Sequence, residues 1–167
     1  MKREHLGARP ARRSEAGFTV LELMMVVLII AILITFLAPT FLGASARAKD
    51  RAVQSSIRNG FSAAKSIYAD EGDYTQATTA ALTAAVGGGN LVFVNSGTAP
   101  SGNNTLSVDP VNSDFVVLSA HSKSGICFYL SDDATGGGVR YARVAAAGGC
   151  AASGAPLPGD PQWMSKW

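Results

Sequence analysis

Histidine and cysteine are scarce in this chain, which has two of each among its 167 residues. His5 lies near the amino terminus, and His121 has no evident nucleophile partner in the sequence. Histidine is the side chain that most often performs acid-base catalysis near neutral pH, and the sequence presents no catalytic constellation. We therefore expect neither an enzyme nor a bound cofactor.

An excess of basic residues is also missing from most of the chain. Residues 1–17 hold five basic and two acidic side chains, a sum of +3, so residues 18–167 carry 2 − 3 = −1 of the formal net charge of +2. Proteins that bind nucleic acid present a basic patch, and we expect no nucleic-acid site here. The run Gly87–Gly89 lacks the lysine and the hydroxyl residue of a phosphate-binding loop.

What the chain has is one long apolar run, from Phe18 to Ala38. Its length of about 21 residues gives roughly 32 Å of helix, enough to cross the hydrocarbon core of a bilayer. Lys and Arg beside a spanning helix stay in the cytoplasm, so residues 1–17 are predicted to lie inside and the rest outside. A cleaved secretory signal peptide is the alternative, but the run is long and no clean small-residue cleavage site follows it.

Glu22 is the acidic residue within this run. A carboxylate in a spanning helix costs about 2.5 to 3.5 kcal/mol on insertion scales, so it normally has a partner. The run contains no Lys or Arg to provide one. Glu22 either extends to the membrane surface near the helix end or pairs with a cation of another molecule.

The arrangement Gly17-Phe18-Thr19-Val20-Leu21-Glu22-Leu23, behind a basic leader, resembles the amino-terminal signature of type IV pilins. The resemblance implies cleavage by a prepilin peptidase between Gly17 and Phe18, N-methylation of Phe18, and a role for Glu22 in assembly. It also implies a homo-oligomeric filament, other pilins, a pilus assembly platform and the cytoplasmic membrane as partners. Cleavage would create a cation at Phe18 for Glu22 of a neighbouring copy.

The helix is predicted to continue beyond the apolar run. Pro39 removes one backbone hydrogen bond and favours a kink there, as at the matching place in pilins; a helix end at Ala38 is the alternative. An apolar stripe at helical spacing follows, and Gly72 provides a stop. We expect three parts: a leader (1–17), a long helix (18–72) and a head (73–167). Within the helix, 18–38 is the membrane or filament core and 39–72 is amphipathic. The stripe consists of Val53, Ile57, Phe61, Ala64 and Tyr68.

The head is expected to be α+β, with a short helix over 78–86 and an antiparallel sheet of about four strands against the long helix. Segments 122–125 and 132–138 are predicted hairpin connections. Trp163 and Trp167 either cover an edge of the sheet or face a neighbouring molecule. The predicted strands are 91–95, 114–120, 126–131 and 139–144.

Cys127 and Cys150 are either two buried thiols or a disulfide, and an oxidising compartment beyond the membrane favours the disulfide. Many pilins tie a strand to the carboxy-terminal loop in this way. Asp132 and Asp133 lie among glycines, and some secretion pseudopilins bind calcium near this end. A solvated hairpin loop is the preferred interpretation, and no metal site is expected.

These features predict a structural subunit of a type IV pilus. A pseudopilin of a type II secretion apparatus shares the same amino-terminal half and is one alternative. A single-pass membrane protein with a binding module outside is another.

Overall fold

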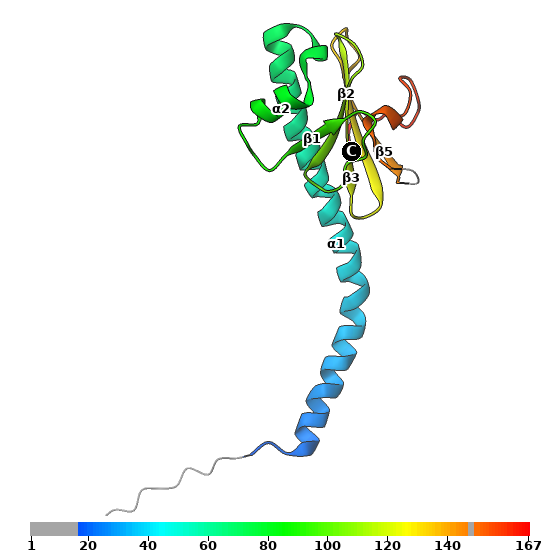
Figure 1. Ribbon diagram of the computed structural model, residues 1–167. Helices are drawn as coiled ribbons and strands as arrows, with labels where there is room; N and C mark the ends of the chain where they lie inside the picture. Colours follow the sequence, from blue (N-terminus) through cyan, green and yellow to red (C-terminus); the bar gives the residue numbers. More distant parts are fainter. Residues whose placement is uncertain (1–16, 147–148) are drawn as a thin grey trace, which may run out of the picture. The chain divides into compact units, whose positions relative to one another are not determined.

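A computed structural model describes residues 17–146 and 149–167 of the chain, with the side chains of 37–40 and 42 left out. The chain divides into two structural units, residues 1–41 and residues 42–167. The second unit forms the head, in which the later part of helix α1 packs on a sheet (Figure 1).

Helix α1 runs from Val20 to Glu71 and contains 52 residues. It continues through position 39, so the prediction of a helix beyond the apolar run is confirmed and an end at Ala38 is wrong. It ends where predicted, because Gly72 has a φ of +70°, a conformation that L-residues other than glycine rarely adopt. In the predicted stripe Val53, Ile57 and Ala64 are fully buried, with the two aromatic members packed beside them.

The sheet has five strands in the order β1-β2-β3-β4-β5. Pairs β2–β3, β3–β4 and β4–β5 are antiparallel, whereas β1 is parallel to β2. The α+β class and a mostly antiparallel sheet packed on α1 are confirmed. The prediction of about four strands missed β2 and the parallel pairing of β1 with it. The strands are β1 Val92–Asn95, β2 Thr105–Pro110, β3 Phe115–Ser122, β4 Ile126–Asp133 and β5 Gly138–Ala145.

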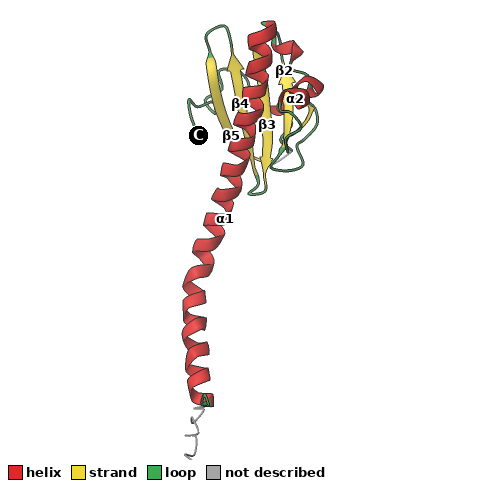
Figure 2. Cartoon of the chain, turned by 90° about the vertical axis from the view of Figure 1, so that its left-hand side faces the viewer, coloured by secondary structure: helices red, strands yellow, loops and turns green. Residues whose placement is uncertain are grey.

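Both faces of the central strands are covered. Alternate residues of β2, β3 and β4 join the core with α1, among them Leu106, Leu118 and Phe128. Figure 2 shows α1 crossing this face of the sheet. The intervening residues Val117, Cys127 and Tyr129 form a second cluster with the chain that follows β5. Burial on two sides explains why β3 and β4 are almost continuously buried rather than alternating.

Short elements close the ends of the head. The predicted helix over 78–86 is present as α2 (Thr79–Ala85), with the Thr78 hydroxyl accepting a hydrogen bond from the Ala81 amide. The 3-10 turn η1 (Tyr74–Gln76) follows α1. A second 3-10 turn, η2 (Ala152–Gly154), precedes the carboxy-terminal tail. Trp167 packs against Phe128 and Tyr141, so this tryptophan covers the side of the sheet next to α1.

Candidate functional site

The segment just before α1 is exposed and non-helical. Gly17, Phe18 and Thr19 lie outside the helix, and 78% of the Phe18 surface is accessible. Among the described residues, a Cβ atom built on Gly17 would have no neighbour within 4 Å. Within the described part of the chain, Gly17 and Phe18 are therefore exposed.

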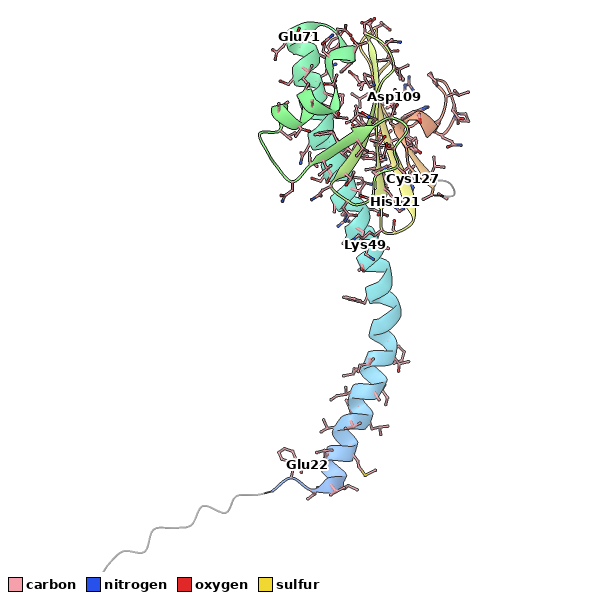
Figure 3. The ribbon with its side chains drawn as sticks, viewed as in Figure 1. Glu22, Lys49, Glu71, Asp109, His121 and Cys127 are labelled. Carbon is pink, nitrogen blue, oxygen red and sulfur yellow. A yellow bond between two sulfur atoms is a disulfide. The ribbon has the colours of Figure 1, made fainter. Side chains whose placement is uncertain are left out.

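Thr19 starts the helix. Its side-chain oxygen accepts a hydrogen bond from the Glu22 amide at 3.2 Å, and its carbonyl accepts one from the Leu23 amide at 3.2 Å. This is an N-cap, and it places Glu22 in the first turn of α1. The positive end of the helix dipole favours a carboxylate in that turn. Figure 3 labels Glu22 there. Among the described residues, Glu22 forms no ion pair.

The described part of the first unit exposes an apolar surface that no other described residue covers. Between Phe18 and Phe36 the large apolar side chains keep 47% to 80% of their surface accessible. Continuous exposed apolar surface of this kind marks a site of interaction with another protein or with lipid. The exposed segment around Gly17 and Phe18, the capped Glu22 and this apolar surface follow one another within twenty residues.

Residues 12–38 match the family model described as the prokaryotic N-terminal methylation motif. The chain carries a type IV prepilin-like signal. The predicted resemblance is thereby confirmed, and the signal includes Gly17, Phe18 and Glu22. It points to a structural subunit that associates with other pilin-type subunits and with a processing peptidase. The comparison with curated proteins found no match, and neither did the comparison with solved structures.

Pro39 lies one residue beyond the matched segment, and its kink stays a prediction. Within the described residues, no helix combines the length and the apolar character needed to cross a membrane.

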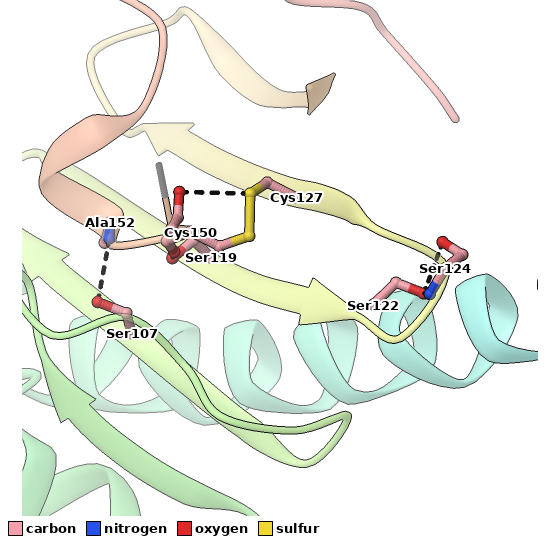
Figure 4. Close-up of a disulfide and its surroundings, with 8 residues drawn as sticks. Ser107, Ser119, Ser122, Ser124, Cys127, Cys150 and Ala152 are labelled. Atoms are coloured by element: carbon pink, nitrogen blue, oxygen red, sulfur yellow. Dashed lines mark hydrogen bonds between the residues drawn. A yellow bond between two sulfur atoms is a disulfide. The ribbon is translucent and has the colours of Figure 1, made fainter. Parts of the chain in front are cut away.

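The disulfide joins Cys127 of β4 to Cys150, which follows β5, with the two Cα atoms 5.3 Å apart (Figure 4). Serines on neighbouring strands hold the same segment. The Ser119 hydroxyl donates to the Cys150 carbonyl, and the Ser107 hydroxyl accepts from the Ala152 amide at 3.0 Å. Ser107 and Ser119 lie directly opposite each other on β2 and β3. No local sequence signal marks this pair, which pins the segment after β5 to the sheet.

Asp132 is buried, and the prediction of a solvated loop for this residue is wrong. Strand β4 extends through it, and its Oδ2 accepts hydrogen bonds from Tyr74 Oη and from Lys65 Nζ, the latter at 2.7 Å. Burial raises the pKa of Tyr74 well above its ordinary value, and the hydrogen bond to Asp132 raises it further. The carboxylate is thus committed to two donors inside the head.

Asp133 lies at the end of β4, before the turn over 134–137. Its side chain accepts hydrogen bonds from the amide and the hydroxyl of Thr135, which lower the pKa of Asp133. The two aspartates therefore have separate protein partners. In the part of the chain that the structure describes, no three potential metal ligands gather.

Proposed function

We propose that this chain is a structural subunit of a type IV pilus, cut between Gly17 and Phe18 and assembled through residues 18–38. The observation that carries the proposal is the methylation motif over residues 12–38, which coincides with an exposed segment leading into an uncovered apolar helix. Residues 1–17 form the leader, which stays in the cytoplasm. Residues 18–38 are held in the membrane until the assembly platform extracts the subunit.

Glu22 sets the register of assembly in this proposal. Removal of the leader leaves a free ammonium group on Phe18, four residues before Glu22, and methylation of that amine keeps its charge. The carboxylate of one copy then meets the ammonium of the next in a bundle of parallel helices. An ion pair in an apolar bundle loses much of its attraction to desolvation, so its main effect is to select one axial offset between copies.

Two variants separate processing from assembly. Gly17→Arg places a large side chain at the cut and should leave the leader attached. Glu22→Val should still be cut and inserted but should not enter fibres, because the Phe18 ammonium then lacks its partner. Glu22→Asp, which keeps the charge, is the matched control. Fibres of normal number from Glu22→Val would contradict the role of Glu22.

A secretion pseudopilin would be processed in the same way, because the motif is common to both kinds of subunit. It differs in its task, since a pseudopilin belongs to a secretion apparatus. Deleting this chain should remove surface fibres and leave protein export intact. Loss of export with surface fibres unchanged would favour the pseudopilin.

A further inference from the structure

The head carries its charges at two opposite ends. Residues 42–167 contain nine basic and nine acidic side chains, 9 − 9 = 0. Most of them gather by sign, although Lys65 and Arg140 lie near the acidic group and Asp50 lies near the basic group. Figure 3 shows Glu71 and Asp109 toward one end of the head, and Lys49 and His121 toward the other. Along α1, Lys49 and Glu71 are about 33 Å apart at ~1.5 Å per residue.

The end at which α1 stops is acidic, and we call it the acidic end. Tyr68 contacts Asp114 just before β3, which places the start of that strand beside the last turns of α1. Phe115 of β3 pairs with Asp133 of β4, and Val117 pairs with Asp109 of β2. Two basic residues lie nearby, Arg140 and Lys65, and Lys65 is paired with Asp132. The acidic end consists of Asp70, Glu71, Asp73, Asp109, Asp114 and Asp133.

The opposite end is basic, and we call it the basic end. Here Asp50 of α1 accepts hydrogen bonds from Ser122 and Ser124, which fix the β3–β4 turn beside the helix. Lys123 lies exposed in that turn, and Arg143 is exposed on the last part of β5. The basic end consists of Arg47, Lys49, Arg51, Lys123 and Arg143.

Among the described residues these charges form no ion pair within a single copy. Asp73, Asp114 and Asp133 accept hydrogen bonds inside the head, whereas Asp70 and Glu71 have no such role among the described contacts. The one salt bridge among the described residues joins Lys65 to Asp132 and uses neither end. Asp70 and Glu71 occupy the last turn of α1, which has no basic residue. The helix dipole is negative there, so carboxylates at this position oppose helix stability.

We propose that the acidic end of one head docks on the basic end of a second copy, so that heads stack end to end in one direction. The inference rests on the proposed function. A contact between two different ends of the same molecule can repeat from copy to copy, and it generates a filament when its rotation does not close a ring. Like ends repel, which disfavours a reversed copy. Exposed ion pairs contribute little affinity, so the charges mainly select orientation and register.

Carbodiimide treatment of fibres that contain the full-length processed chain tests this contact. The reagent joins a carboxylate to a lysine amine that touches it. We expect cross-linked peptides that join Asp70 or Glu71 to Lys49 or Lys123, together with a ladder of covalent multimers. Because these groups are so far apart within one head, such links must form between copies. Lys49→Arg with Lys123→Arg is the matched control, which keeps the charge and should keep the fibres but lose these links.

Charge reversal provides a second readout. Lys49→Glu with Arg51→Glu should lower the amount of fibre about tenfold or more, because like charges would then face each other across the contact. Fibres that contain the chain but lack the expected cross-links, or that tolerate the reversal, would overturn the end-to-end contact alone. Absence of the wild-type chain from all fibres would overturn both this contact and the proposed function.

Discussion

The hydroxyl of Tyr74 donates a hydrogen bond to the carboxylate of Asp132, 58 residues further along the chain. Tyr74 is fully buried, and its ring stacks on that of Tyr68 with centroids 4.4 Å apart. Lys65 donates to the same carboxylate and lies over both rings. This arrangement ties the last turns of α1 and the 3-10 turn after it to β4.

Tyr74→Phe should lower the free energy of unfolding of the head by about 2 kcal/mol near pH 7, since Asp132 would lose a donor inside the protein. The pKa of Tyr74 is raised above its ordinary 10.0 in the folded state. Its unfolded form loses the proton first, so this contribution is complete below about pH 10 and declines as the pH rises further. The variant should therefore lose less stability than the wild type between pH 9 and pH 11.

Urea unfolding followed by tryptophan fluorescence measures this, because both tryptophans, Trp163 and Trp167, lie in the head. The full chain in detergent is the sample. An identical alkaline decline in wild type and variant would contradict the assigned role of Tyr74.

Gly60→Ala should destabilise the head by about 1 to 3 kcal/mol, the usual cost of overpacking a core. A Cβ atom at Gly60 would lie 2.3 Å from Cδ1 of Leu106 and 3.3 Å from Cδ2 of Leu118. This penalty outweighs the gain of about 1 kcal/mol that alanine brings to a helix interior. Gly43→Ala is the matched control, because among the described side chains its Cβ atom would meet that of Arg47 alone, at 3.8 Å. A Gly60→Ala head as stable as the wild type would show that α1 can move away from the sheet at no cost.

Replacing Cys127 and Cys150 together by alanine should lower the free energy of unfolding of the head by about 3 kcal/mol. Without the disulfide the unfolded chain is no longer closed into a loop, so it gains conformational entropy. The sequence separation of the two cysteines is 23 residues. Ser119 and Ser107 still hold the segment after β5 in this variant, so the folded head should persist with a lower urea midpoint. Ser107→Ala in the cysteine-free background should lower the midpoint again. No further change would mean that the serines do not anchor this segment.

The local patterns of α1 were predictable because they lie within a few residues of each other. The stripe that includes Val53, Ile57 and Ala64 has helical spacing, and Gly72 supplies the left-handed stop. Capping by Thr78 likewise follows from its position before a short helical segment. The prepilin-like signal is also a local pattern, since it depends on residues 12–38 alone.

What escaped prediction depends on partners distant in sequence. Strand β2 ends in Asp109 and Pro110, residues that are rare in strands, and it is held by neighbours on both sides. Its parallel partner β1 gives no local sign of its direction. Asp132 looked like a loop residue among glycines, because its partners Tyr74 and Lys65 belong to another part of the chain. Nothing in the sequence around Gly60 indicates that the sheet approaches the helix so closely at this position.

Cleavage after Gly17, methylation of Phe18 and entry into surface fibres can be read from one sample. Mass spectrometry of the amino-terminal peptide from purified fibres should give a peptide that begins at Phe18 and is heavier by one methyl group. Glu22→Val cells should yield no such fibres. Fibres without this polypeptide, in cells whose copies all retain residues 1–17, would overturn the proposed function.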